Sequence, residues 1–413
     1  MEFDRRQILR GAGALAGLSL ISARAQGAVK LSASPVFASE VPRTLVLLQF
    51  AGGNDGLSTV VPFADDGYNA ARRATRIAEK DVLRLDDYRG FHPELKRMHA
   101  AWQAGKLAVI EGAGYANPIR SHFKSYEIWH TADERGRAAG EGWIGRLVNA
   151  AWPDDRDPNL VVHIGKNVPY SVYSLTHPAA SFATPTGYKW AGDESERAAL
   201  EKGGEICEHG EKADEKEPAN NLEYLRKVLR DGQASSEAIR RAAVRYRTKT
   251  EYAGDELAQA LRDVAALSVG QVGSRVFSLE LSGFDTHSDQ KNRHDALMRR
   301  LDASLPTFLA DIAGTEAGKS TLVVAFSEFG RRVKENGSGG TDHGVAGPMF
   351  VAGEAVKGGL YGKHPSLTKL DDGDLVHTTD FRSVYATVIE KWFGVDASRV
   401  LRAKYPVLPL LKA

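Results

Sequence analysis

Short apolar runs alternate with helical segments along this chain, and this alternation limits the folds open to it. Residues 43–50 form a continuous apolar run, as expected of a strand buried on both faces. Similar runs lie at 107–111, 160–164, 276–281 and 321–326, and helical patterns cover 93–105, 121–131, 221–267, 293–309 and 381–393. The alternation predicts an α/β fold, with a mainly parallel sheet and helices on both of its faces.

Length and charge exclude several classes of partner. The chain has 413 residues, enough for one large α/β domain or for two smaller ones. Its 54 lysines and arginines nearly balance its 53 aspartates and glutamates, so no net field attracts nucleic acid or an anionic membrane. We therefore expect no nucleic-acid partner.

One segment differs from the rest in composition. Residues 192–217 are crowded with charged side chains and hold almost no large apolar ones. We predict a single domain at residues 26–413 that carries a charged and helical insertion at about 192–267. Cys207, the only cysteine, lies in this segment and is interpreted as incidental, with metal binding as the alternative.

The N-terminus has the features of an export signal. Arg5 and Arg6 precede an apolar stretch from Gly11 to Ala23, and Ala23-Arg24-Ala25 fits the small-x-small pattern of a cleavage site. A membrane anchor or an amphipathic helix is the alternative, but the stretch is shorter than the roughly 20 residues that span a bilayer. We predict a twin-arginine signal peptide at residues 1–25 and recognition by the twin-arginine export machinery. The mature protein would be periplasmic or otherwise exported, without a stable membrane span.

Polar clusters follow the predicted strands. Ligands of parallel sheets bind beyond the carboxyl ends of the strands, so the loops after Phe50, Glu111, Leu281 and Phe326 should share one edge. Carboxylates and imidazoles in these loops are the ligand types that divalent metals take from proteins. This edge is therefore the predicted site.

Two acid–histidine pairs are the strongest metal candidates. Asp285 and His287 lie two residues apart after a strand, so both side chains would project to one face of an extended chain. An Asx-type turn with a surface histidine is the alternative. Asp342 and His343 are adjacent in a glycine-rich loop, so His343 is the predicted ligand and Asp342 its supporter or a second ligand. A plain surface loop would explain that pair equally simply.

Two further strand ends add candidates. Asp55 could bridge metal ions and the neighbouring Asn54 could donate to a substrate oxygen, although both residues are also ordinary in turns. Glu328 could complete a carboxylate-rich site, and Arg331 or Arg332 could bind an oxyanion. Here the alternative is a helix-start glutamate with solvated arginines.

Ser121 stands at the predicted start of a helix, after Arg120. The positive end of a helix dipole favours an anion or an alkoxide there, and a nearby metal could make the hydroxyl a nucleophile. Simple capping of the helix is the alternative. The chain contains no Gly-x-Ser-x-Gly elbow, Walker loop, His-Glu-x-x-His helix or Rossmann glycine fingerprint, which excludes the commonest serine hydrolases, NTPases, zincins and dinucleotide enzymes.

Taken together, these segments resemble the exported bacterial family known as domain of unknown function 1501. The twin-arginine start matches, as do the following pieces, which run in order over almost the whole mature chain: Gly52-Gly53-Asn54-Asp55-Gly56, Arg120-Ser121-His122-Phe123, Asp285-Thr286-His287, Ser327-Glu328-Phe329-Gly330-Arg331 and Thr341-Asp342-His343-Gly344. The family is in turn distantly similar to the alkaline phosphatase and sulfatase superfamily.

That resemblance implies an alkaline-phosphatase-like fold and a set of roles. It implies metal ligands at Asp55, at Asp285 with His287, at Glu328 and at His343, and a nucleophile at Ser121. This sequence departs from the superfamily pattern at Glu328-Phe329, where an imidazole ligand is lost. The tight spacing of Asp285 and His287 argues against a full two-metal site. The Cys-x-Pro-x-Arg motif of sulfatases is absent.

The predicted function is an exported, metal-dependent hydrolase or transferase that acts on a phosphate or related ester in a small molecule or polymer. The cofactor would be one or two divalent ions, drawn from Zn, Mn, Mg and Ca. Asn54, Arg120 or Arg331 would stabilise the oxygens of the transferred group. One alternative is a binding or assembly protein that keeps the fold without catalysis, and another is a metal-dependent hydrolase of a carboxylic ester or peptide.

Overall fold

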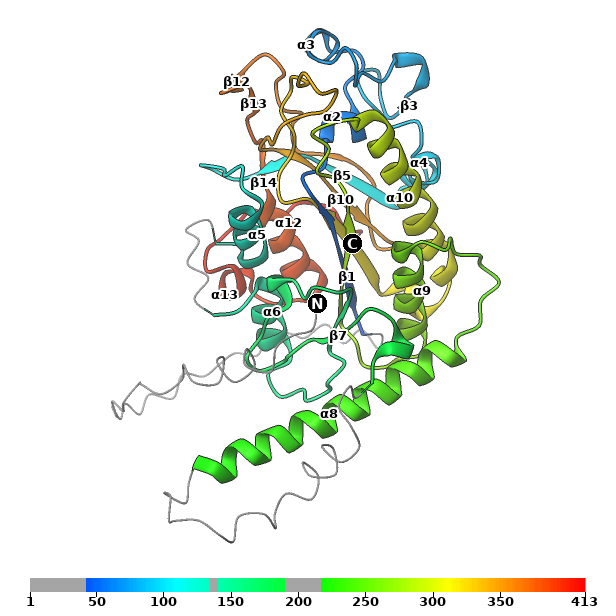
Figure 1. Ribbon diagram of the computed structural model, residues 1–413, viewed down its shortest axis with the longest axis vertical. Helices are drawn as coiled ribbons and strands as arrows, with labels where there is room; N and C mark the ends of the chain where they lie inside the picture. Colours follow the sequence, from blue (N-terminus) through cyan, green and yellow to red (C-terminus); the bar gives the residue numbers. More distant parts are fainter. Residues whose placement is uncertain (1–41, 134–139, 190–216, 413) are drawn as a thin grey trace, which may run out of the picture. The chain divides into compact units, whose positions relative to one another are not determined.

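Within the described residues, nine strands form the main sheet (Figure 1). The computed structural model describes residues 42–133, 140–189 and 217–412, all within one compact unit, Ser39–Ala413. The predicted signal at residues 1–25, the charged segment at 192–216 and Cys207 lie outside the described residues. The strands, in their order across the sheet, are β11 (Gly359–Tyr361), β5 (Leu107–Gly114), β10 (Gly347–Ala352), β9 (Thr321–Phe326), β1 (Thr44–Ala51), β8 (Val276–Ser282), β6 (Val161–Ile164) and β7 (Ala180–Phe182), with β14 (Thr379–Asp380) paired to β5.

The sheet is mainly parallel, which confirms the predicted fold class. Strand β1 pairs in parallel with β8 and β9, and β6 pairs in parallel with β7 and β8. The exception is β10, which lies antiparallel between β9 and β5 and which the sequence analysis did not predict. All five predicted strands are present, as β1, β5, β6, β8 and β9.

Alternate residues of the buried strands face two separate cores. On β1, Val46, Leu48 and Phe50 pack into one core, whereas Leu45 and Leu47 pack into the other. Side chains that alternate between two buried faces explain why the run 43–50 is apolar throughout.

Helices cover both faces, as predicted, and Figure 1 shows the two groups on opposite sides of the strands, apart from the long helix at 217–245, which crosses below them in this view. The first core contains side chains of α4 (Lys96–Gln103), α8 (Glu217–Arg245), α9 (Glu256–Val269) and α10 (Gln290–Ile312). The second contains side chains of α5 (His122–Thr131), α6 (Trp143–Ala151), α12 (Phe381–Thr387), which continues as a π-helix over Val388–Trp392, and α13 (Ala397–Leu401). The helical pattern at 221–267 thus corresponds to two helices, and α9 contributes to the main core.

Smaller elements complete the fold. Short helices are α2 (Gly56–Thr59), α3 (Asp66–Ala71) and α11 (Glu316–Lys319), and single 3₁₀ turns cover Glu79–Asp81, Tyr170–Val172 and Pro185–Gly187. Two small sheets consist of β2 (Val60–Val61), β3 (Leu83–Arg84) and β4 (Gly90–Phe91), and of β12 (Leu370–Asp371) with β13 (Asp374–Leu375). No helix within the described ranges is long and apolar enough to cross a membrane.

Candidate metal centre

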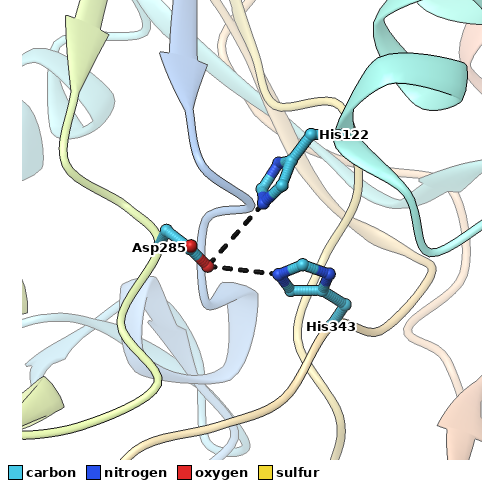
Figure 2. Close-up of side chains that lie close together, drawn as sticks. All are labelled: His122, Asp285 and His343. Atoms are coloured by element: carbon cyan, nitrogen blue, oxygen red, sulfur yellow. Dashed lines mark hydrogen bonds and ion pairs between the residues drawn. The ribbon is translucent and has the colours of Figure 1, made fainter.

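Three loops bring a carboxylate and two imidazoles together at the carboxyl edge of the sheet (Figure 2). Asp285 follows β8, His343 lies in the loop between β9 and β10, and His122 is the first residue of α5, which follows β5. Asp285 Oδ1 lies 3.1 Å from His343 Nε2 and 3.8 Å from His122 Nε2. The predicted edge of the sheet therefore carries a compact set of metal-ligand types.

His287 adds a third imidazole to this group. Its Nε2 lies 3.1 Å from Asp285 Oδ1 and 3.0 Å from His343 Nε2. In a tetrahedral site with bonds near 2.0–2.1 Å, neighbouring ligand atoms are about 3.3 Å apart. The separations of His287 from Asp285 and His343 fall around that value, so these three residues can contact one divalent ion.

The second ring nitrogen of each histidine contacts an oxygen that can only accept a hydrogen bond. His122 Nδ1 donates to Glu328 Oε1 at 2.8 Å, and His287 Nδ1 donates to Asp342 Oδ1 at 3.2 Å. Because a carboxylate has no hydrogen to give, Nδ1 carries the proton in both rings. In the neutral imidazole, Nε2 then presents its lone pair to the centre.

His343 makes the same kind of Nδ1 contact, but with a backbone oxygen. Its Nδ1 donates to the carbonyl oxygen of Arg120 at 2.9 Å, which again leaves Nε2 as the acceptor nitrogen. Neutral His287 and His343 would thus face each other with lone pairs at 3.0 Å. Such an arrangement is repulsive unless a proton or a metal ion lies between the rings, and outer oxygen partners of this kind are typical of metal-bound histidines.

Asp285 is held in its charged form. Burial raises the pKa of its carboxyl group, but the hydrogen bond and the positive charge of Arg331 outweigh that effect, and the pKa falls to about 2. At neutral pH the residue is therefore a carboxylate, the form that binds metals.

Arg331 organises the loops around the centre. Its guanidinium is fully buried, and it donates at 2.7 Å to Asp285 Oδ1. Its other acceptors are the carbonyl oxygens of Gly52, Gly53 (2.8 Å), Phe284 (3.0 Å) and Thr341 (2.8 Å). The predicted contact between Arg331 and a substrate oxygen does not fit this burial, because the donors serve the protein.

Two glycines allow the loop after β1 to approach the centre. Gly52 has φ +119°, and a Cβ there would lie 2.4 Å from the backbone nitrogen of Asp285. Gly53 has φ +81°, and a Cβ there would lie 2.3 Å from the ring of Phe329. That ring in turn packs against His122 and His343, with centroid distances of 4.9 and 4.7 Å. Larger side chains at either glycine would displace groups that shape the site.

Two predicted ligands, Glu328 and Asp342, contact the histidines of the centre from outside. Glu328 is fully buried, and its Oε1 accepts from Gly52 N at 2.9 Å as well as from His122, so the carboxylate orients His122. Asp342 orients His287 in the same way, whereas the sequence analysis made it a partner of His343. The sequence analysis did not select His122, although it lies in the Arg120-Ser121-His122 segment.

Asp55 lies in a different, fully buried ion pair. Arg72 contacts both of its carboxylate oxygens, at 2.5 Å and 3.1 Å, and Ser58 Oγ donates to Oδ2 at 2.8 Å. Gln290 also donates to Asp55. The structure does not bring Asp55 into the His122–Asp285–His343 group, because its oxygens serve Arg72 and the start of α2.

The three remaining candidates, Asn54, Arg120 and Ser121, have different surroundings. Asn54 is 1 % exposed, and its side-chain oxygen accepts from Thr59 Oγ1, so the amide does not face solvent. The Arg120 side chain pairs with Asp372 and Asp374 in the β12–β13 hairpin. Ser121 caps α5 without using its side chain.

Residues 113–403, well over half of the chain, match the family model described as "Protein of unknown function (DUF1501)". The chain belongs to this family. No curated protein matches the sequence. The matched range of the family includes every member of the metal centre but begins after Asp55 and Arg72.

Solved structures with a similar arrangement of strands and helices include the following three. A protein of the alkaline phosphatase superfamily from Vibrio parahaemolyticus is 9 % identical, with 87 % of this chain and 69 % of that chain covered and a TM-score of 0.39. A sulfatase described as putative, from Bacteroides thetaiotaomicron, is 9 % identical over 88 % and 75 %, with a TM-score of 0.38. A sulfatase from Pseudoalteromonas sp. is 10 % identical over 89 % and 71 %, with a TM-score of 0.36. Scores this low do not establish a shared activity.

Metal binding should depend on the outer partners of the histidines as well as on the ligands. We expect His343→Ala to abolish tight binding of Zn²⁺ or Mn²⁺, and Asp342→Ala to weaken it about 10- to 100-fold, because His287 loses the acceptor that orients its ring. Isothermal titration calorimetry measures both effects. The control is Asp371→Ala, another exposed aspartate. Equal affinities in the Asp342 and Asp371 variants would contradict the assignment.

The Asp55–Arg72 pair should govern stability. We expect Arg72→Met to lower the free energy of unfolding by about 3–5 kcal/mol, because it leaves a buried carboxylate without its counter-charge. Burial raises the pKa of Asp55, but Arg72 outweighs it and the pKa falls to about 2, so this contribution is present above pH 4 and is lost as the pH falls toward 2. Urea unfolding measures the change. The exposed Arg76→Met should cost less than about 0.5 kcal/mol, and a similar small cost for Arg72→Met would refute the role.

Proposed function

We propose that this protein is an exported, metal-dependent hydrolase or transferase that acts on a phosphate or related ester. The observation that carries the proposal is the convergence of three Nε2 atoms and one carboxylate oxygen, with every Nδ1 held by an oxygen acceptor. Imidazole-rich sites favour Zn²⁺ or another transition metal over Mg²⁺ and Ca²⁺. Export is supported by the sequence pattern at residues 1–25.

Exposure supports access of a substrate to the centre. The side chains of Asp285 and His287 are 49 % and 44 % exposed, and those of His122 and His343 are 26 % and 21 % exposed. A buried structural site would hide these groups. The exposed side of the centre is therefore the proposed place where an ester group binds.

Ser121 is the proposed nucleophile. The residues on either side of it contact the centre, since the Arg120 carbonyl accepts from His343 and His122 Nε2 faces Asp285. Among the described residues its hydroxyl has no hydrogen-bond partner. The free N–H groups at the start of α5, a helix of 10 residues, favour negative charge beside this hydroxyl.

The proposed reaction is a displacement at phosphorus or a related centre. A divalent ion, when bound, favours deprotonation of a nucleophile and offsets negative charge on the transferred group. The Ser121 oxygen gives up its proton and forms the new bond to phosphorus while the bond to the leaving oxygen breaks and that oxygen takes up a proton. A water or an acceptor alcohol then displaces the serine oxygen from phosphorus in the same way, and the serine oxygen regains a proton; attack by water in the first step would release the product directly. Backbone N–H groups of α5 stabilise the oxygens of the transferred group, a role that buried Arg331 and Asn54 do not fill.

One observation favours a non-catalytic alternative. The carboxylate of Asp55 is neutralised by Arg72 rather than free for a second ion, so a two-metal site of the kind used in ester hydrolysis is incomplete here. In that case the protein would bind a metal without turnover. A panel of aryl phosphates, aryl sulfates and carboxylic esters separates this reading from ester hydrolysis of any class.

Substitution of Ser121 should separate catalysis from metal binding. We expect metal-loaded protein to hydrolyse an aryl phosphate and a chelator to abolish the activity. Ser121→Ala should lower kcat by about 10²–10⁴-fold at unchanged metal content, because the nucleophile is lost while the ligands remain. The control is Ser338→Ala, an exposed serine in the loop that carries His343. Full activity in the Ser121 variant would rule out this nucleophile, and full activity of metal-free protein would rule out the proposal.

A further inference from the structure

A second concave site lies at the opposite edge of the sheet from the metal centre. It has a volume of about 630 Å³ and lies between the C-terminal part of α8 and residues 266–272 at the end of α9. Strand β8 begins at Val276, just after this segment, and leads to Asp285 at the other edge. A strand of 7 residues spans about 20 Å, so the two sites are separated by the length of the sheet.

Small residues form the floor of this pocket. Ala238 and Ala242 on α8 lie opposite Ala266 and Gly270 at the end of α9. A Cβ on Gly270 would lie 3.0 Å from the Cβ of Ala242, which shows how closely the two segments approach. Because these side chains are short, the longer side chains around them project beyond them, and a hollow remains in between.

Three arginines line the hollow: Arg241, Arg245 and Arg247, all of them exposed. The lining contains no aspartate or glutamate. Within the part of the chain that the structure describes, Arg241 and Arg245 make no ion pair or hydrogen bond, and Arg247 donates only to neighbouring carbonyl groups.

The spacing of these charges is unfavourable without a counter-ion. Arg241 and Arg245 are four residues apart on α8, where like charges repel each other by about 0.2–0.5 kcal/mol. Helix C-termini attract basic residues, which accounts for part of the arrangement. That attraction does not account for three guanidinium groups around one concave surface.

The loop after α8 is fixed in place, so the pocket is preformed. Tyr246 Oη and Tyr252 Oη donate to Asp311 Oδ2 at 2.6 and 2.7 Å, and Thr248 Oγ1 donates to Oδ1. The oxygens of Asp311 are thereby engaged by hydroxyls rather than by the arginines. The wall that carries Arg247 is anchored to α10 by these bonds.

We propose that this hollow is a binding site for a phosphate- or sulfate-bearing ligand. Guanidinium groups bind such oxyanions through paired N–H donors, and the apolar side chains of Val269 and Val272 offer a surface for the uncharged part of the ligand. The volume falls in the range of small-molecule sites. The oxyanion belongs either to a soluble molecule, such as a sugar phosphate, or to the headgroup of an anionic lipid.

Binding to metal-free protein tests the site apart from the metal centre. Inorganic phosphate and glucose 6-phosphate are titrated by calorimetry, and phosphatidylglycerol vesicles by co-sedimentation. We expect saturable binding that weakens with salt, and a loss of about tenfold or more in the variant Arg241→Gln/Arg245→Gln. Binding of the soluble phosphates identifies a soluble ligand, whereas binding of the vesicles alone identifies a headgroup.

The matched control is Arg76→Gln/Arg399→Gln, which removes two exposed arginines elsewhere and the same net charge. It should bind like the unmodified protein, and both variants should keep its thermal unfolding midpoint. Absence of binding to every probe, or an equal loss in both variants, would overturn the proposal. Neither outcome bears on the activity proposed for the metal centre.

Discussion

The candidate site depends on one buried cation, the guanidinium of Arg331. Burial of a charge is costly unless it is fully paired, and Arg331 meets this condition by joining the loops after β1 and β8 to the loop that leads to His343. It thereby fixes Asp285 where the three imidazoles converge. The carboxylates of Asp285, Glu328 and Asp342 outnumber this one cation, and a divalent ion would offset their excess negative charge.

Much of this arrangement could be predicted from local sequence. The apolar run at 43–50 and its counterparts are strands because both faces are buried, and parallel strands place their carboxyl-end loops at one edge. Asp285, His287 and His343 follow such strands and do meet. The rule that the loops after parallel strands share one edge thus predicted that these side chains lie close together.

Other features depend on contacts that local sequence does not reveal. Arg72 pairs with Asp55 across 17 positions, and nothing in either segment predicts that partner. Whether Glu328 binds an ion or orients His122 is decided by the direction of its side chain. The sequence signal for His122 was its place beside Ser121, but only the fold turns its Nε2 toward Asp285. Strand β10 enters the sheet antiparallel between β9 and β5, a position that chain order does not reveal.

The central claim is that the imidazoles of His122 and His343 and the carboxylate of Asp285 bind one divalent ion. X-ray absorption spectroscopy of the zinc-loaded protein tests it most directly, because outer-shell scattering counts imidazole ligands. The account predicts one ion per chain with two or three imidazoles and one carboxylate oxygen at about 2.0–2.1 Å. A spectrum with one imidazole or none, or protein that retains no metal, would contradict it.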